Sequence, residues 1–324
     1  MNAVVQEAYG SSGVLGVVDI ERPDVGDAGV LVEVHAASVN ALDWHMTRGM
    51  PFLLRLDEGI RAPKNRVRGV DLAGRVVAVG SKVARFKPGD EVFGGSNGSF
   101  AEYTVTTEDR LALKPRRLDF QGAAALHIGG LTALQGLRDR AGVQPGQRVL
   151  INGAGGGVGI YAVQVAKWLG AHVTAVTRTE SVDMVRSIGA DEVVDHRTND
   201  FTRLAARFDV LFDLGGNRPL RQCCRVLARG GMLVVAGGPA GRWVEPAGRM
   251  LRAVLLSPLV PQRVVPFISK NDQASLATVA ELAEAGAIRP VIDRVYPLRE
   301  APDAIAYVGS GRARGKVVID VAGR

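Results

Sequence analysis

The chain has 324 residues, 47% hydrophobic and 23% charged, which is the composition of a globular protein long enough for two domains. Its formal net charge is +7, but the basic residues are scattered and the densest cluster, 114–117, is too short for a nucleic-acid surface. It shows no signal peptide, no apolar run of membrane-spanning length and only two, adjacent cysteines, so we expect a cytoplasmic protein without nucleic-acid partners or stable membrane insertion.

Residues 1–120 contain short β-rich runs separated by turns rich in Gly, Pro and Asp. The runs are 30–34, 76–79, 91–93 and 101–105. This spacing is typical of a small β-barrel or sandwich. A helix is predicted over 120–140 and leads into the next region.

Residues 147–168 form the most informative stretch. An apolar run over 149–151 enters a glycine cluster over 153–159, and apolar residues at helical spacing follow. In this strand–turn–helix geometry, a helix N-terminus presents free N–H groups to a dinucleotide pyrophosphate. A strict G-x-G-x-x-G is absent, so a flexible loop is the competing interpretation. The flanking patterns favour a phosphate-binding turn, with contacts from Gly153, Gly156, Gly157, Val158 and Gly159.

Strands and helices alternate after this turn. Strands are predicted at 172–177, 192–194, 209–214 and 232–236, and a helix over 180–188. The alternation specifies a parallel, doubly wound sheet, and with the glycine turn it predicts a Rossmann cofactor domain. The apolar segment 250–268 is interrupted by two arginines and three prolines, and we interpret it as a surface lid or subunit contact, or as a transient membrane contact.

The C-terminal part returns to strands. After a predicted helix over 273–284, β-rich runs lie around Tyr296 and over 316–319. They are too few for a sheet of their own, so we expect them to rejoin the N-terminal domain. The predicted domains are 1–122 with 288–324, and 123–287.

Several motifs, in this order and spacing, make the chain resemble the medium-chain dehydrogenase/reductase superfamily, in its zinc-free quinone oxidoreductase branch. They are 37–44, 69–74, 79–80, 86–94, 130–133, the glycine turn, 189–191 and 315–318. The resemblance covers essentially the whole chain. It implies an α/β protein with a GroES-like β-barrel catalytic domain and a Rossmann domain. It also implies reduction of quinones or α,β-unsaturated ketones by NADPH, and a homodimer.

The same resemblance bears on zinc. Zinc-dependent members use a thiolate at the position of Asn40 and a His-Glu pair at the position of residues 69–71, which here read Gly-Val-Asp. The four-cysteine structural lobe is absent, and the five histidines show no paired ligand spacing. We therefore expect no bound metal.

Without zinc, the charge that develops on a substrate oxygen during hydride transfer needs another donor. Asn40 is the first candidate, because relatives place the metal-ligating thiolate there. Its alternative role is a buried tie between two loops. His45 is a second candidate and could equally be a surface histidine; a backbone N–H or water remains open. Asp43 is expected to orient Asn40 or neighbouring backbone rather than to transfer a proton.

Arg178, after the second strand of the sheet, predicts NADPH. An acid there would bind the ribose hydroxyl of NAD, whereas an arginine pairs with a 2′-phosphate. Glu180 leaves NADH as an alternative, although an acid also suits the first turn of the next helix. The resemblance adds His196 near the phosphate, Thr132 near the nicotinamide and Lys316 from the returning tail. Further cofactor contacts are expected at the carboxyl edge of the sheet, from Thr177, Leu214, Gly215, Gly237, Gly238, Phe267 and Ile268.

The combined prediction is a zinc-independent, NADPH-dependent oxidoreductase that transfers hydride to a small hydrophobic quinone or α,β-unsaturated ketone. An NAD(P)-dependent alcohol or aldehyde oxidoreductase on the same fold is the second hypothesis. A weakly catalytic cofactor-binding protein with a structural or RNA-binding role is the third. The lack of a basic stripe and of clustered surface aromatics argues against RNA.

Overall fold

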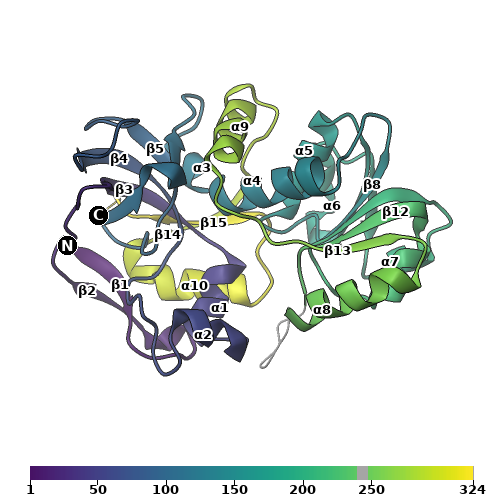
Figure 1. Ribbon diagram of the computed structural model, residues 1–324, viewed down its shortest axis with the longest axis horizontal. Coiled ribbons are helices and arrows are strands. Elements are labelled where there is room, and N and C mark those ends of the chain that lie inside the picture. The colour runs from purple at the N-terminus through teal and green to yellow at the C-terminus, as the bar shows by residue number, and fades with distance from the viewer. Residues whose placement is uncertain (239–246, 324) are drawn as a thin grey trace. The chain divides into compact units, whose positions relative to one another are not determined.

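The chain forms two units (Figure 1). The computed structural model describes residues 1–238 and 247–323, apart from the side chains of Leu54, Asp57 and Ala247. The first unit contains Met1–Leu131 and Asn271–Arg324, and the second contains Thr132–Lys270.

Seven strands form the main sheet of the first unit, in the order β14-β15-β3-β4-β5-β7, with β6 also paired to β3. Their bounds are β3 (Gly29–Val39), β4 (Asp71–Val79), β5 (Glu91–Gly95), β6 (Tyr103–Thr107), β7 (Leu111–Leu113), β14 (Ile292–Pro297) and β15 (Lys316–Asp320). β1 (Asn2–Gln6) and β2 (Leu15–Asp19) form a separate antiparallel pair. β15 pairs antiparallel with β3, so the tail rejoins the N-terminal sheet as predicted.

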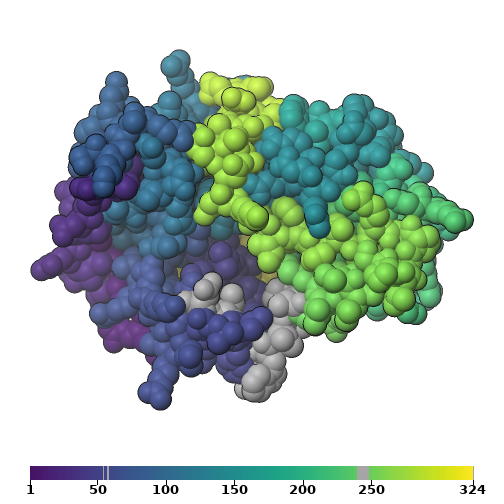
Figure 2. Space-filling model, in the orientation of Figure 1, coloured from purple at the N-terminus to yellow at the C-terminus, as the bar shows by residue number. Residues whose placement is uncertain are grey.

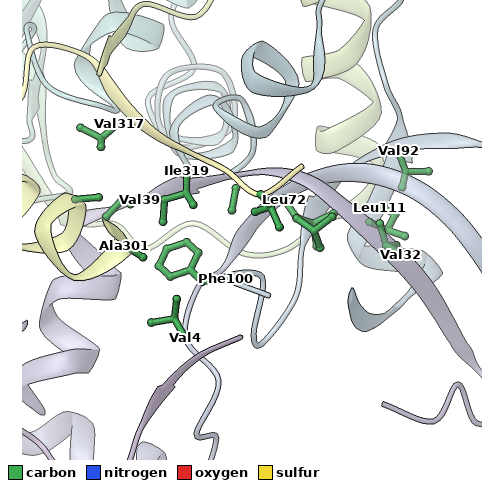
Figure 3. Packing of buried hydrophobic residues seen from close by; sticks show 14 of the residues in the cluster. Val4, Val32, Val39, Leu72, Val92, Phe100, Leu111, Ala301, Val317 and Ile319 are labelled. Carbon is green, nitrogen blue, oxygen red and sulfur yellow. The ribbon is translucent and has the colours of Figure 1, made fainter. Parts of the chain in front are cut away.

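The core of this unit holds three strand ends in place. Val39 of β3, Ile319 of β15 and Ala301 pack around Phe100, and all four side chains are buried (Figure 3). In the register of the sheet, Ser38 of β3 lies opposite Asp71 of β4, and Val39 lies opposite Val317 of β15. The residue after β3 and the first residues of β4 and β15 therefore meet at one edge of the sheet.

Six helices lie wholly or, in the case of α4, partly in the described part of the first unit. They are α1 (Ala41–Arg48), α2 (Arg55–Glu58), α3 (Phe120–Ala124), α4 (His127–Leu134), α9 (Gln273–Glu284) and α10 (Ala301–Gly309). The single helix predicted over 120–140 is instead α3, α4 and a π-helical turn, Gln135–Arg140. The break depends on a residue far away in the chain, because Asp71 Oδ1 accepts the Ile128 N–H at the start of α4 and so caps a new helix.

The division between the units differs from the predicted boundaries, which were 122/123 and 287/288. It falls instead at 131/132 and 270/271. α3 packs on β3 and β4, and α9 packs on β7. Val279 of α9 also lies so close to Gly130 that a Cβ there would be 2.9 Å from it. Both helices therefore belong to the first unit.

The second unit is a six-stranded parallel sheet in the order β10-β9-β8-β11-β12-β13, the doubly wound arrangement that the alternation predicted. The strands are β8 (Arg148–Asn152), β9 (His172–Thr177), β10 (Glu192–Asp195), β11 (Phe208–Asp213), β12 (Leu227–Val235) and β13 (Arg263–Pro266). The helices are α5 (Gly159–Trp168), α6 (Val182–Ser187), α7 (Leu220–Arg225) and α8 (Ala247–Leu256). The strands are continuous apolar runs because parallel sheets are buried on both faces.

The apolar segment 250–268 is mostly a packed part of this unit, so its interpretation as a lid is wrong. It contains most of α8 and all of β13, the sixth strand of the sheet. Ala253, Leu256 and Val264 are buried in its core. The opposite side of α8 carries exposed Leu251 and Leu255, and this helix reaches the surface (green in Figure 2). Subunit contact through that side stays a prediction.

Both cysteines lie on α7 and are buried, Cys223 fully and Cys224 with 4% of its surface exposed. The helix packs both thiols because its neighbours α8 and β12 cover two of its sides. Among the described residues, no helix has the length and apolar character needed to cross a bilayer.

Candidate active site

The glycine turn of the second unit joins β8 to α5 and leaves no room for side chains at two positions. A Cβ on Gly159 would lie 2.2 Å from the carbonyl oxygen of Gly153, and one on Gly155 would lie 2.5 Å from Thr177 Oγ1. Gly153 itself has φ +93°, in the left-handed region that favours glycine. These glycines let the first turn of α5 pack directly against the ends of β8 and β9.

The same turn leaves backbone donors free. The N–H groups of Gly153 and Ala154 donate to the Val176 carbonyl, but those of Gly157 and Val158 have no acceptor among the described residues. A Cβ on Gly156 would meet only one atom, the Gly153 oxygen at 3.5 Å, so the space beside it is open. Unpaired N–H groups at a helix N-terminus beside open space fit a pyrophosphate.

The loops after β11 and β12 meet this turn at the carboxyl edge of the sheet. The N–H groups of Leu214 and Gly215 donate to the Asn152 carbonyl at the end of β8. A Cβ on Gly237 would lie 1.9 Å from the Leu214 oxygen, so the two loops touch backbone to backbone, with Gly238 next in the chain. β8 and β11 are the neighbours at which the strand order reverses, the usual ligand position in such sheets.

The candidates nearest the end of β13 also lie together. The hydroxyls of Thr132 and Ser269 share a hydrogen bond of 2.9 Å. Ser269 follows Phe267 by two residues in the chain. The Phe267 N–H donates to the Val235 carbonyl, whereas the Ile268 side chain is 72% exposed. Thr132, Phe267 and Ile268 are therefore neighbours in the second unit.

The ends of β9 and β10 bring Arg178 and His196 side by side. Thr177 and Asp195 are paired in the sheet, and the His196 N–H donates to the Thr177 carbonyl over 2.9 Å. Glu180 is the residue that left NADH as an alternative cofactor. Its carboxylate forms an ion pair of 2.8 Å with Arg197. The carboxylate of Glu180 is thus already occupied by an arginine.

In the first unit, Asn40 belongs to a buried polar cluster. Lys316 Nζ donates to Asn40 Oδ1 over 2.6 Å and to Asp71 Oδ2 over 3.2 Å. His127 Nδ1 lies 3.0 Å from Asp71 Oδ1, and its Nε2 lies 3.1 Å from Asn271 Oδ1. Lys316, Asp71 and His127 are each at most 1% exposed. We call these five residues the Lys316 cluster.

The charges of the cluster compensate one another. Burial alone would raise the pKa of Asp71, but the Lys316 ammonium and the hydrogen bond from His127 bring it below its ordinary value, so Asp71 is a carboxylate. The ion pair with Asp71 offsets the cost of burying the Lys316 ammonium. The cofactor role expected for Lys316 is therefore corrected, because its buried ammonium is engaged by Asn40 and Asp71.

Asp43 orients the start of α1, as predicted. Its Oδ2 accepts the Asn40 N–H over 2.7 Å, one half of a capping box. Its Oδ1 has no partner in the described part of the chain, and burial raises its pKa to about 7. A cavity of about 60 Å³, lined also by Arg68, adjoins the carboxyl and is large enough for water.

His45 lies one turn further along α1 and is half-buried rather than a surface histidine. Its Nδ1 is 3.0 Å from the Met50 carbonyl oxygen. Because a carbonyl only accepts hydrogen bonds, Nδ1 carries a proton. Neutral His45 therefore offers an acceptor at Nε2, and only the imidazolium offers a donor there. Burial lowers the pKa of His45.

The side chains around Asn40 bear on whether a metal could bind there. Among the described residues, no three His, Cys, Asp or Glu side chains gather as metal ligands. The atom of Asn40 that could ligate a metal, Oδ1, instead accepts the Lys316 ammonium. A second cation at that point would be repelled, so these residues do not fit zinc.

Sequence reasoning did not identify Asp71, His127 or Asn271 as site residues. Asp71 belongs to the Gly-Val-Asp motif over 69–71. An acidic residue at the start of a buried strand could have identified it as a candidate site residue. His127 and Asn271 carry no such signal, because their partners lie 56 and 144 residues away along the chain.

Known proteins match both units. A profile described as "Alcohol dehydrogenase GroES-like domain" matches residues 26–116, and one described as "Zinc-binding dehydrogenase" matches 188–319. The chloroplast envelope quinone oxidoreductase homolog of Arabidopsis thaliana is 33% identical over 340 residues, covering 99% of this chain and 98% of its own. An NADPH-dependent alkenal/one oxidoreductase of the same plant, a chloroplastic protein, is 33% identical over 98% of this chain and 79% of its own.

Comparison with solved structures also shows a match over the whole chain. The quinone oxidoreductase from Coxiella burnetii superimposes with a TM-score of 0.89 at 28% identity, and the alignment covers 99% of both chains. The full-length match in sequence and in fold, together with the two domain profiles, leaves one assignment. The chain belongs to the medium-chain dehydrogenase/reductase superfamily, in its quinone oxidoreductase branch.

Proposed function

We propose that this protein is a zinc-independent, NADPH-dependent oxidoreductase that transfers hydride to a quinone or an α,β-unsaturated ketone. The observation that carries the proposal is Asn40, an amide whose oxygen is bound by an ammonium where zinc-dependent relatives ligate a metal. The relatives named as quinone and NADPH-dependent alkenal/one oxidoreductases support the same reaction class.

The glycine turn supports a nicotinamide dinucleotide in the second unit. The free N–H groups of Gly157 and Val158 would bind its pyrophosphate. Arg178 and His196, adjacent at the ends of β9 and β10, would bind a 2′-phosphate and so favour NADPH over NADH. When bound, the dihydronicotinamide supplies the hydride. Leu214, Gly215, Gly237 and Gly238 shape the edge along which the cofactor would lie.

The protein's chemical task is to stabilise the oxygen on which negative charge develops. Asn40 can donate from Nδ2, because its Oδ1 is already occupied. Imidazolium His45 can donate from Nε2, because Met50 holds the other nitrogen. Asp43 keeps Asn40 at the start of α1. Protonation of the enolate or hydroquinone anion that hydride transfer leaves can come from solvent.

The decisive experiment is an NADPH-oxidation screen over quinones, enones and aldehydes, with the metal content of the same sample measured. We expect turnover of quinones or enones at a zinc stoichiometry well below one per chain. Turnover of aldehydes alone would favour the alcohol or aldehyde oxidoreductase hypothesis. Absence of any turnover, with retained NADPH binding, would favour the weakly catalytic one. The cytoplasmic location and the homodimer remain predictions.

A further inference from the structure

The first unit contains a cavity of about 520 Å³ beside α1 that has no part in the proposed function. This volume is typical of pockets that bind small molecules. The cavity lies where the turn Ser12–Val14 contacts both α1 and α10, two helices that pack side by side (Figure 1). Its described lining residues lie within 9–12, 44–55 and 306–310, so the whole cavity belongs to one unit.

Two aromatic rings line this cavity, and each packs against a glycine. A Cβ on Gly309 would lie 2.0 Å from Trp44 Cδ1, and one on Gly49 would lie 2.5 Å from Tyr9 Cδ1. Each ring therefore occupies space that a side chain at the glycine would fill. The Tyr9 hydroxyl also donates to the Gly59 carbonyl over 2.7 Å. The two rings are thus held in place before any ligand binds.

An arginine stacks on each ring. The guanidinium carbon of Arg48 lies 4.7 Å from the centre of the Trp44 ring, and that of Arg55 lies 4.4 Å from the centre of the Tyr9 ring. Arg55 Nε donates to the Gly49 carbonyl over 2.9 Å, whereas Arg48 donates no hydrogen bond within the described part of the chain. A guanidinium that stacks on a ring keeps the N–H groups at its edge available to a ligand.

The charge of the lining is positive and is not neutralised by an acid. Arg48 and Arg55 are both half-buried, and neither forms an ion pair with a described residue. No Asp or Glu is among the described residues that line the cavity. Glu58, three residues after Arg55, lines a separate and smaller cavity with Arg68. Two guanidiniums without an acid partner attract an anion, and their planar N–H edges match the oxygens of a carboxylate or phosphate.

We propose that this cavity is a binding site for a small organic oxyanion, a carboxylate or phosphate carried on a flat, apolar group. The oxygens would accept hydrogen bonds from Arg48 and Arg55. The flat group would pack against the apolar part of the lining, which includes Trp44 and Met50. The inference goes beyond the proposed function, because that function binds the cofactor phosphates in the second unit.

Calorimetric titration of the NADP⁺-saturated protein tests the proposal, because the bound cofactor then occupies the proposed phosphate-binding groups of the second unit. The probes are phenyl phosphate and benzoate, compared with benzamide, which keeps the ring but carries no charge. We expect one molecule of either anion to bind per chain, and benzamide to bind at least about tenfold more weakly. Inorganic phosphate should bind more weakly than phenyl phosphate, because it has no apolar group to bury.

Two variants locate the site. Arg48→Gln and Arg55→Gln should each weaken the binding of both anions by about tenfold to a hundredfold, the value of a charge-assisted hydrogen bond. Arg48→Gln removes no hydrogen bond within the described part of the chain, so it should keep the wild-type melting temperature even if Arg55→Gln does not. The matched control is Arg61→Gln, which changes an exposed arginine outside the lining and should leave both affinities within about twofold.

Three results would overturn the inference. Equal affinities of the wild type and Arg48→Gln would show that the anions bind elsewhere, and equal affinities for benzoate and benzamide would show that the charge is not recognised. The third is the absence of binding by either anion at about 10 mM. Failure of NADP⁺ to bind would instead count against the proposed function, and the same titrations on the protein alone would then test the cavity.

Discussion

A single carbonyl oxygen decides which form of His45 can help the reaction. Met50 binds the Nδ1 proton, so the outward nitrogen donates only when the ring is an imidazolium. Burial lowers the pKa of this ring, so the donating form exists on the acid side of that lowered value. His45 and Asn40 therefore differ as donors: the first depends on pH and the second does not.

The first prediction concerns this pH dependence. The kcat for an enone should fall as pH rises through the pKa of His45 and then level off at the rate supported by Asn40. His45→Gln, whose amide donates at every pH, should remove that fall and lower the acid-side plateau by about tenfold or more. Rate profiles of both proteins between pH 5 and 9 check it. A profile unchanged by His45→Gln would remove His45 from the site.

The second prediction concerns cofactor choice. Arg178→Ala should raise the KM for NADPH by about tenfold to a hundredfold, the value of a charge-assisted contact to phosphate, and leave that for NADH unchanged. Arg207→Ala, an exposed arginine bonded to local carbonyls, is the matched control. Equal NADPH preference in wild type and Arg178→Ala would show that the 2′-phosphate is bound elsewhere.

At the scale of elements, the strand–turn–helix around β8 is the part that sequence predicted best. Its signal is local: an apolar run, a glycine cluster and a helical pattern lie within some twenty residues, and each has a backbone cause. The interruption between α3 and α4 was not predictable in this way. It depends on Asp71, which caps α4 from another strand and stands 57 residues earlier in the chain.

Two glycines of that turn allow a sharp comparison. Gly159→Ala should lower the melting temperature, because its Cβ would overlap the Gly153 oxygen at 2.2 Å. Gly156→Ala should keep the melting temperature, since its Cβ meets the protein only at 3.5 Å, but should weaken NADPH binding if the cofactor occupies that space. Calorimetry and fluorescence titration measure the two effects. Unaltered NADPH affinity in Gly156→Ala would place the pyrophosphate away from this glycine.

At the scale of the whole molecule, Asp43 links stability to pH. Its pKa is raised from 3.8 to about 7 in the folded protein, so the folded state binds more protons than the unfolded state between those values. Stability should therefore fall as pH rises from about 4 to 7, by at most about 1.4 kcal/mol per pH unit, and the contribution should be fully present only below that range.

The variant Asp43→Asn tests this directly, because an amide still accepts the Asn40 N–H and does not titrate. Denaturant unfolding at pH 5 and pH 8 should show a smaller difference in free energy for the variant than for the wild type. The same difference in both proteins would assign the pH dependence to other groups.

The fold class and the return of the tail to the first sheet were predictable, because hydrophobic periodicity and turn residues are local patterns in the sequence. The Lys316 cluster was not. Lys316 and Asn40 are 276 residues apart, and only the register of β3 against β15 places them 2.6 Å from one another. Asn40 could be named from its motif position alone, while its partner was assigned to the cofactor. A contact between side chains so far apart in the chain cannot be predicted from a local sequence pattern.

The burial of α7 has a consequence for the proposed reduction of quinones and enones. Such compounds are electrophiles that alkylate thiolates, and burial raises the pKa of Cys223 to about 12 and that of Cys224 to about 11. Both sulfurs therefore stay protonated and screened from solution at neutral pH. Neither cysteine therefore presents an exposed thiolate that an electrophilic substrate could alkylate.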